Sequence, residues 1–430
     1  MALKLIPFTF SLIALGMVYV FVRAARGERA AWFATLFYGT AVSLLKWNFD
    51  ARGGYAECQV LIPLTLYLLG SRALSPASRT RDAALVGLFS GFGVYLLQMF
   101  VPVGLTCALL LSLRRGAAER VRSLAAFGLG AVAGMAPVLL HGSPGGAVGL
   151  DPRPLLARLV SLPQALFLTL TRFLPGLFSY DNLEGYPPFR LFPNGLEYVF
   201  LLAALAVLVS RRGRSLGFPP SETAPVPIEG ILFLYVGIYL VLFSLHPLAA
   251  NSPRYLLFLE PPLSILAGLG AAEALAWSGR RSVRGVAVIL VSLVLGDRAV
   301  QMTRLAGDDR IYGPDGPSDP RTAEAVMAFL DENGIRRLVT EDWDLGWRIA
   351  FKSRERIIAL HNLNNLHQAP PFAAVVAEGS EDDHRVFALL EKRGQPVARY
   401  VLSGKAIYTV GLEPSVARDP HPAARPGGHS

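Results

Sequence analysis

Long apolar segments recur through the first 300 residues, and short clusters of arginine separate them. The chain is 52% hydrophobic and only 17% charged, whereas a soluble domain carries about 25% charge. A helix needs about 20 mostly apolar residues to cross a bilayer. We therefore predict an α-helical, polytopic membrane protein with about ten transmembrane helices, near 5–22, 30–46, 55–70, 83–99, 101–113, 123–140, 196–210, 228–246, 254–276 and 285–297.

The arginine clusters lie at alternate ends of these segments. If the segments cross the bilayer in turn, sixteen arginines share one side: Arg23, Arg26, Arg29, Arg72, Arg79, Arg81, Arg114, Arg115, Arg120, Arg122, Arg211, Arg212, Arg214, Arg280, Arg281 and Arg284. The short loops opposite contain only Lys4, Lys46, Arg52 and Arg254. Cytoplasmic loops carry an excess of Lys and Arg, so the arginine-rich side is predicted to be cytoplasmic. The net charge of +9 then indicates contact with membrane lipids, and we expect no nucleic-acid partner.

Residues 83–113 test this topology. A single crossing there would place the following arginines outside, whereas two short helices broken near Pro102 keep every cluster inside. The same topology places Met1 on the outer face, which is unusual for a polytopic protein. We therefore expect a further helix before Met1.

The long segment 141–195 is predicted to lie on the outer face. Its first part alternates apolar runs with Arg158 and Arg172, a pattern typical of helices in the membrane interface. Its second part, SYDNLEGYPPFRLFPNG, contains Asp181, Glu184 and Arg190 among aromatic, Gly and Pro residues. This part is either a structured surface loop or a lid over a membrane-facing cavity.

The chain changes character after the last apolar segment. Helix-like and strand-like stretches alternate from RTAEAVMAFLDENG to KAIYTV, which predicts a small α/β soluble domain within 301–411. The helical membrane domain would occupy 1–300, and the Pro- and Gly-rich residues 412–430 are expected to be disordered.

The outer loop 46–57, KWNFDARGGYAE, is the first candidate site. Lys46, Asp50, Arg52 and Glu57 interrupt two apolar segments, and a Gly-Gly pair permits close backbone approach to a ligand. Two acids and two bases there can hold a phosphate and a polar substrate. The alternative is a solvated turn with an interfacial tryptophan.

The second candidate site is 246–260, HPLAANSPRYLLFLE. Arg254 enters the bilayer from outside, where a guanidinium suits a phosphate head group, and Tyr255 is an interfacial aromatic. Glu260 lies about 9 Å deeper if the segment is α-helical, before an interruption at a Pro pair. An acid inside the membrane needs a cavity or a partner, so Glu260 is either functional or paired with a buried arginine or backbone amide.

Several other kinds of site are not predicted. The seven His residues do not have metal-ligand spacing, and the two Cys residues imply no disulfide framework. The Gly-rich stretch near 142–149 lacks the Gly-Lys-Ser pattern of a phosphate-binding loop. No cofactor is therefore assigned, although a divalent metal is compatible with the loop acids.

Three segments together resemble one family: ARGGYAE at 51–57, RYLLFLEPP at 254–262, and AEAVMAFLDENGIRRLVTEDWDLGWRIAFKSRERIIA at 323–359. They are similar to GT-C-type membrane glycosyltransferases that use polyprenyl-phosphate sugars, including protein O-mannosyltransferases and lipid A aminoarabinose transferases. The resemblance spans most of the chain. The family's first helix and first acidic outer loop would precede Met1, so no catalytic Asp of that loop is carried over.

The resemblance implies a bundle around a cavity open to the outer face and to lipid. It also implies inverting hexosyl or pentosyl transfer, in which an acceptor hydroxyl attacks the anomeric carbon and polyprenyl phosphate leaves. Asp50 and Glu57 would then position the acceptor or a metal, while Arg52 and Arg254 would bind phosphate. The implied location is the bacterial plasma (inner) membrane in the cell envelope, with the C-terminal domain extracytoplasmic.

Three functions remain open at this point. The first is a membrane glycosyltransferase that moves a sugar from a polyprenyl-phosphate donor to an unknown glycan, lipid or protein acceptor. The second is a non-catalytic membrane protein that binds a lipid-linked sugar or a partner. The third is a transporter or flippase, which ranks last because the sequence contains no internal repeat.

Overall fold

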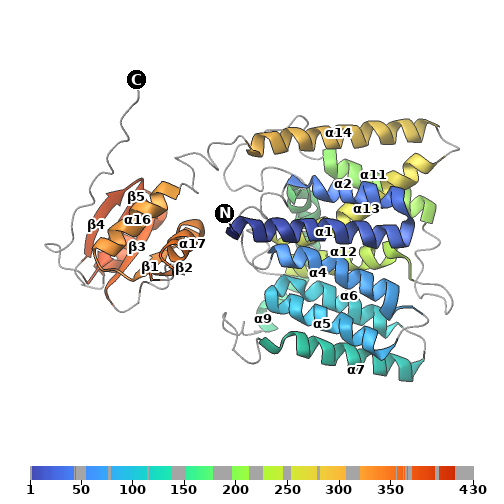
Figure 1. Cartoon of the computed structure of the whole chain (residues 1–430), viewed down its shortest axis with the longest axis horizontal. Coiled ribbons are helices and arrows are strands. Elements are labelled where there is room, and N and C mark those ends of the chain that lie inside the picture. Colours follow the sequence, from blue (N-terminus) through green and yellow to red (C-terminus); the bar gives the residue numbers. More distant parts are fainter. Residues whose placement is uncertain are drawn as a thin grey trace. The chain divides into compact units, whose positions relative to one another are not determined.

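The chain forms two compact units, Met1–Thr303 and Arg304–Ser430, in a computed structural model. The first is a bundle of helices and the second contains a small sheet (Figure 1). The structure describes residues 2–42, 44, 55–75, 79–113, 116–137, 152–177, 196–212, 226–245, 253–277, 281–306, 320–354, 356–361, 363, 366, 370–392 and 397–411.

The helices of the first unit run roughly parallel or antiparallel to one another (Figure 1). The described elements are α1 (Ala2–Arg26), α2 (Glu28–Gly39), α4 (Tyr55–Leu68), η1 (Leu69–Ala73), α5 (Thr80–Leu96), η2 (Gln98–Phe100), α6 (Val101–Ser112), α7 (Ala117–Gly134), α9 (Pro152–Leu168), η3 (Thr169–Phe173), α10 (Leu174–Leu177), α11 (Leu196–Arg212), α12 (Ile228–Leu245), η7 (Pro253–Leu259), α13 (Glu260–Ala276) and α14 (Arg281–Ala306). Each predicted apolar segment overlaps one of these helices.

Three features differ from or sharpen the sequence prediction. The break in 83–113 is confirmed, because α5 ends at Leu96 and α6 begins at Val101 with Pro102 in its first turn, where its missing N–H costs nothing. The helix predicted at 30–46 is interrupted, because α2 ends at Gly39 and Val42 and Leu44 are helical again after Thr40 and Ala41. The helix predicted at 285–297 continues to Ala306, so the charged residues after its apolar part are still helical.

Only some of the described helices have the length and composition that are needed to span a membrane. Three helical stretches are long and apolar enough to cross a membrane: Pro7–Arg26, Ile228–Leu245 and Leu256–Ala276. Gln98–Ser112 and Leu159–Thr171 are apolar but shorter. The described helices therefore agree with a membrane domain but do not establish ten crossings.

Helix α13 forms the centre of the bundle. Nearly all of its residues are buried, and it packs on α2 through Gly268 and on α11 through Gly270. A Cβ at Gly268 would lie 2.4 Å from the backbone nitrogen of Ala34, so only glycine permits this approach. The start of α13, which carries Glu260, is thus held in the interior.

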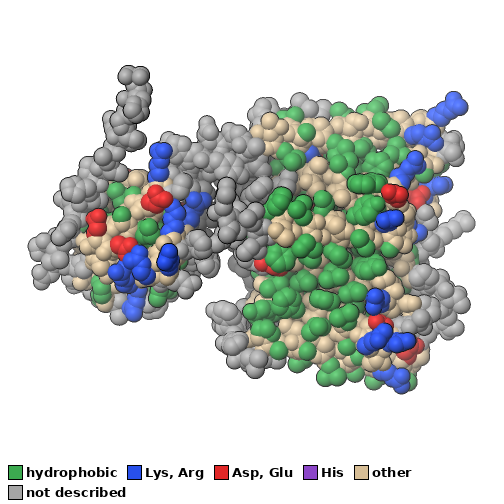
Figure 2. Space-filling view, in the orientation of Figure 1, with side chains coloured by type: hydrophobic (Ala, Val, Ile, Leu, Met, Phe, Trp, Pro, Cys, Tyr) green, Lys and Arg blue, Asp and Glu red, His purple; other side chains and the backbone are tan. Residues whose placement is uncertain are grey.

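On the face that Figure 2 shows, most of the exposed basic side chains of the helical unit gather at one end. Here α1 ends and α12 begins, and Arg26 of α1 forms two 2.7 Å bonds to Glu229 of α12. Here too α11 ends, and Arg211 lies over the ring of Trp277 just after α13. For the described residues, the prediction that the arginine clusters share one side is confirmed. We call this end the basic end. The opposite end, which we call the loop end, is where α2, α12 and α14 finish and where α4, α11 and η7 begin.

The second unit is a five-stranded sheet covered by helices on both faces. Its elements are α16 (Pro320–Glu332), β1 (Arg337–Thr340), α17 (Trp343–Lys352), β2 (Ile358–His361), β3 (Phe372–Ala377), α18 (Glu381–Glu391), β4 (Val397–Leu402) and β5 (Lys405–Val410). The strand order is β2-β1-β3-β5-β4, with β1 parallel to both neighbours and β5 antiparallel to both of its own. The sheet has two hydrophobic cores. One contains residues of α16 and α17 and the other contains residues of α18, so α16 and α17 cover one face and α18 covers the other. The predicted small α/β fold is confirmed.

Candidate functional site

The predicted site residues fall into three groups in the structure. Glu57 is half-buried in the first turn of α4, and Glu260 is buried as the first residue of α13. Arg254 and Tyr255 lie in η7, but their side chains are outside the described part. The remaining candidates lie wholly outside the described residues: Lys46, Asp50, Arg52, Asp181, Glu184 and Arg190.

The segment that carries Arg254 is not α-helical, contrary to the prediction. Residues Pro253–Leu259 form a 3-10 helix, and the Pro pair after Glu260 occupies the first turn of α13. The Pro pair therefore starts a helix instead of interrupting one, because proline fits the first turn of an α-helix. Since a 3-10 helix rises about 2.0 Å per residue, Glu260 lies about 12 Å beyond Arg254 along the segment, not 9 Å.

Neighbouring helices hold η7 at its backbone. Gln59 of α4 donates from Nε2 to the Leu257 carbonyl at 3.0 Å, and the Tyr38 hydroxyl of α2 donates to Gln59 Oε1 at 3.3 Å. The Tyr235 hydroxyl of α12 donates to the Phe258 carbonyl at 3.1 Å. These bonds satisfy buried carbonyls that the 3-10 helix leaves available.

The start of α4 packs directly on η7. The rings of Tyr55 and Phe258 stack with their centroids 5.6 Å apart. The structure thus brings together the beginning of α4, which carries Glu57, and the segment that carries Arg254. The described end of the first predicted site therefore lies beside the segment of the second, while Lys46, Asp50 and Arg52 lie outside the described residues.

Glu260 is only 1% exposed, which places a carboxyl group in the interior of a largely apolar unit. Since burying an ionised carboxylate without a partner costs free energy, this placement keeps Glu260 a candidate for either a functional or a structural role.

A buried ion pair that was not predicted from the sequence lies at the loop end. Arg298 donates from Nε to Glu197 Oε1 at 2.8 Å and from Nη2 to Glu197 Oε2 at 2.9 Å. Its Nη1 donates to the Phe37 carbonyl and, at 3.2 Å, to Thr40 Oγ1. One guanidinium therefore joins α2, α11 and α14 at the loop end.

The next turn of α14 adds a second polar contact. Gln301 Nε2 donates to Asp297 Oδ2 at 2.6 Å, and both side chains are at most 3% exposed. The helix predicted from the sequence ended at 297 because charges usually mark the exit from a bilayer. The helical spacing of Asp297, Arg298 and Gln301 is the signal that could have revealed a polar helix face.

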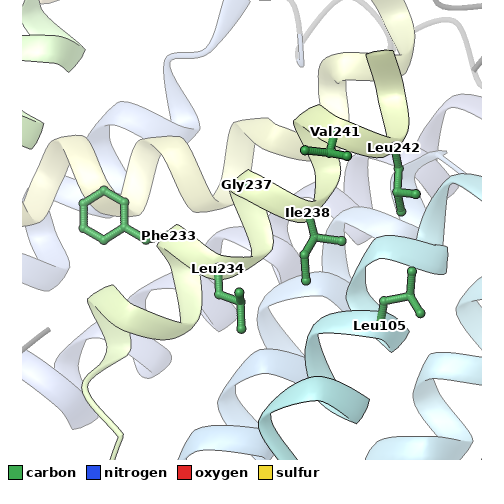
Figure 3. Close-up of a pocket in the computed structure, with 7 residues that line it drawn as sticks. All are labelled: Leu105, Phe233, Leu234, Gly237, Ile238, Val241 and Leu242. Carbon is green, nitrogen blue, oxygen red and sulfur yellow. The ribbon is translucent and has the colours of Figure 1, made fainter. Parts of the chain in front are cut away.

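An apolar groove lies on the side of the bundle, between α6 and α12 (Figure 3). Its volume is about 420 Å³, and its lining side chains carry no polar atoms: Leu105, Phe233, Leu234, Gly237, Ile238, Val241 and Leu242. Gly237 leaves open space in the middle of the groove. Such a surface can accept a hydrocarbon chain but offers nothing to a polar ligand.

No group of three or more His, Cys, Asp and Glu residues with the geometry of a metal site occurs among the described residues. The acids of the 46–57 loop that lie outside the described part are not covered by this statement.

Comparisons with known proteins agree with this architecture. No protein-family model matches the sequence, and no curated protein matches it. Among solved structures, ArnT from Cupriavidus metallidurans bound to undecaprenyl phosphate is similar, with 14% identity and a TM-score of 0.50 over 97% of this chain and 85% of ArnT. The apo state of the same protein also matches, with 14% identity and a TM-score of 0.49 over 96% and 84% of the two chains.

The likeness to the lipid-bound ArnT structure covers nearly the whole chain, so it includes both the helical unit and the sheet-containing unit. At 14% identity, this likeness establishes a shared fold and nothing more. The sequence resemblance to GT-C-type proteins is thereby confirmed, and the chain has a GT-C-like fold.

Proposed function

We propose that this chain is a membrane glycosyltransferase that moves a sugar from a polyprenyl-phosphate donor to an acceptor. The observation that carries the proposal is the likeness of the whole chain to ArnT bound to undecaprenyl phosphate. The apolar groove supports it, because the isoprenoid part of a lipid-linked sugar needs an apolar surface.

The proposed topology is a multi-pass protein of the bacterial plasma membrane. The basic end is cytoplasmic, since arginine and lysine concentrate on that side of membrane proteins. About ten helices cross the bilayer, residues 1–300 form the transferase domain, and the domain at 301–411 is extracytoplasmic. In this arrangement the loop end faces outward, where the candidate site residues meet the acceptor.

In the proposed binding mode, lipid and phosphate occupy separate surfaces. The groove between α6 and α12 is apolar and takes part of the isoprenoid chain, which gains free energy when it leaves water or disordered lipid for a fitted surface. Arg254 at the start of η7, together with Arg52, binds the phosphate. Lys46 and Tyr255 lie in the same two segments and contact the donor.

The proposed reaction is a single displacement at the anomeric carbon. Asp50 or Glu57 accepts the proton of the acceptor hydroxyl, whose oxygen bonds to the anomeric carbon as the bond to the phosphate oxygen breaks. The leaving polyprenyl phosphate gains negative charge, which Arg254 and Arg52 stabilise more strongly in the transition state than in the donor. Glu260 and the segment with Asp181, Glu184 and Arg190 shape the cavity around this centre.

The test is release of undecaprenyl phosphate by the full chain in its native membranes. Donors are undecaprenyl phosphate carrying a hexose or a pentose, and the lipid products are separated and quantified. Wild-type membranes are expected to release undecaprenyl phosphate, and Arg254→Ala is expected to abolish release without unfolding the protein. Arg281→Ala, at the basic end, is the matched control and should release the lipid as wild type does.

The outcomes separate the open functions. Unchanged release by Arg254→Ala would contradict the role of that residue. Donor binding without release from any donor in the set would contradict transfer and favour the non-catalytic lipid-binding protein.

A further inference from the structure

A pair of prolines follows η7 and removes backbone hydrogen-bond donors from its end. An α-helical carbonyl accepts from the N–H four residues later, and a 3-10 carbonyl accepts from the N–H three residues later. For Leu257 and Phe258 the fourth residues are Pro261 and Pro262, which have no N–H. For Phe258 the third residue is Pro261 as well. The Phe258 carbonyl therefore has no backbone donor in either helical pattern, and the Leu257 carbonyl has one only in the 3-10 pattern.

These two carbonyls are the ones that side chains of neighbouring helices bond. The Tyr235 hydroxyl of α12 donates to the Phe258 carbonyl at 3.1 Å, and Gln59 Nε2 of α4 donates to the Leu257 carbonyl at 3.0 Å. All four of these residues are buried. Because a buried carbonyl without a hydrogen-bond donor is destabilising, the two side chains replace what the Pro pair lacks.

The amide of Gln59 is held from both sides. A carbonyl can only accept, so the Leu257 carbonyl requires the NH₂ group of the amide, and the Tyr38 hydroxyl donates to the amide oxygen at 3.3 Å. Tyr38 is itself buried on α2. Side chains of α2, α4 and α12 therefore converge on the junction between η7 and α13, and this explains why polar Gln59 is buried in a largely apolar helix.

The two bonded carbonyls lie between two residues of the proposed site. Arg254 precedes Leu257 in η7, and Glu260, which follows Phe258, begins α13. We propose that Tyr235 and Gln59 are positioning residues that fix the junction between η7 and α13, and so set where the backbone of Arg254 and Glu260 lies during transfer. The proposal rests on the transferase function for its purpose. The hold on the junction can be measured without turnover.

The experiment compares hydrogen–deuterium exchange in the full chain reconstituted into lipid nanodiscs. Tyr235→Phe and Gln59→Met each remove one hydrogen-bond donor and keep a side chain of similar size. In each variant, peptides that cover residues 256–263 are expected to exchange about tenfold faster than in wild type, because a buried carbonyl loses its partner. Tyr38→Phe leaves the Gln59 bond to Leu257 in place and should give a smaller increase.

The proline pair offers a compensating variant. Pro261→Ala returns an N–H that is three residues after Phe258 and four residues after Leu257, so it can serve either carbonyl. Adding Pro261→Ala to Tyr235→Phe or to Gln59→Met should bring exchange at the junction back to within about threefold of wild type. If exchange stays fast in both combinations, the side chains do not replace missing backbone donors and the proposal is overturned.

The control is a hydroxyl on a carbonyl that keeps its backbone donor. Thr106 Oγ1 donates to the Pro102 carbonyl at 2.8 Å within α6, where the N–H four residues after Pro102 belongs to Thr106 itself. Thr106→Val should leave exchange at the junction within about twofold of wild type. Unchanged exchange in Tyr235→Phe and Gln59→Met, or a uniform increase across the helical unit, would overturn the proposal.

Turnover of the lipid donor in the same variants connects the junction to function. The kcat for release of undecaprenyl phosphate should fall about tenfold in Tyr235→Phe and in Gln59→Met, with a smaller change in KM, and should recover in part with Pro261→Ala. Unchanged kcat beside faster exchange would contradict the positioning role. If wild type shows no turnover but the junction loosens as expected, the hold on the junction is supported and the proposed function fails.

Discussion

The two units of this chain hold their charged groups in different ways. In the helical unit, Arg298 and Glu197 are both buried and bond to each other and to a helix end. In the sheet-containing unit, the buried Asp383 accepts a 2.9 Å bond from Arg399, which is 37% exposed, and a further bond from the Tyr408 hydroxyl. One pair lies in an apolar interior, and the other reaches water through its arginine.

This difference predicts how each pair responds to change. Burial by itself would raise the pKa of Asp383, but hydrogen bonds from Arg399, Tyr408 and the Gly379 N–H outweigh burial and lower the pKa to about 2. The group formed by Asp383, Arg399 and Tyr408 therefore stabilises the sheet-containing unit to an extent that depends on pH. In the helical unit both partners of the pair are buried. Loss of one partner therefore leaves the other charge where water cannot reach it.

The largest expected effect is on the buried pair of the helical unit. Arg298→Ala leaves Glu197 unpaired and should lower the free energy of unfolding by about 3–5 kcal/mol. The double apolar variant Glu197→Leu with Arg298→Met should stay within about 1 kcal/mol of wild type, since no charge is stranded. Unfolding in detergent by titration with sodium dodecyl sulfate measures both, and equal losses would contradict this account of the pair.

Close helix packing gives the next largest effect. Gly91 of α5 approaches α7 so closely that a Cβ would lie 2.0 Å from the Ala131 carbonyl oxygen. Gly91→Ala should therefore lower the free energy of unfolding by about 3 kcal/mol, because a backbone atom must move. Gly128→Ala on α7 meets nothing within 4 Å and is the control, with no loss expected. If Gly91→Ala left the free energy of unfolding unchanged, α5 and α7 could move apart without cost, which would contradict this account.

Substitution of Asp383 in the sheet-containing unit should have a smaller effect on the free energy of unfolding, and this effect should depend on pH. The pKa of Asp383 is lower in the folded chain than its ordinary value of 3.8, so its stabilisation is full above about pH 4 and disappears as the pH falls to about 2. Asp383→Asn should cost about 2 kcal/mol at neutral pH and nothing near pH 2. Equilibrium unfolding of the sheet, followed by exchange of β5 amides across this pH range, measures the difference. A loss that does not depend on pH would contradict the role of the charge.

The smallest effect is expected at the surface of the same unit. Asp331 pairs with Arg336 and Arg356, whose side chains are 51% and 56% exposed. Solvent screens such pairs, so Asp331→Ala should change the free energy of unfolding by less than about 1 kcal/mol. A loss as large as that of Asp383→Asn would remove the distinction between buried and exposed carboxylates in this unit.

The sequence predicted the helices of the first unit from their long apolar runs, and the helices and strands of the second unit from their alternating patterns. The alternation in the C-terminal domain, for example, needs only short-range patterns and turn residues. The packing between helices depends on the partner and could not be predicted. Gly87 and Gly91 have the spacing of a helix-packing pair, but their close approach to Phe127 and Ala131 of α7 is visible only in three dimensions.

The candidate site was predicted only in part. Glu260 was expected to be an acid inside the membrane domain, and it is buried at the start of α13. Arg298 was missed because its helix was ended one residue earlier, and its partner Glu197 is 101 residues away along the chain. No local pattern joins these two residues. The roles of Asp50, Arg52 and Arg254 stay predictions, since their side chains lie outside the described part.

The most direct test of the proposed function is lipid binding by the purified full chain, measured by native mass spectrometry. The account predicts a bound adduct with undecaprenyl phosphate that survives competition from membrane phospholipid, and a much weaker adduct with undecaprenol, which lacks the phosphate. Arg254→Ala should reduce the preference for the phosphorylated lipid. Equal binding of both lipids by wild type, or of neither, would contradict a site for a polyprenyl-phosphate donor.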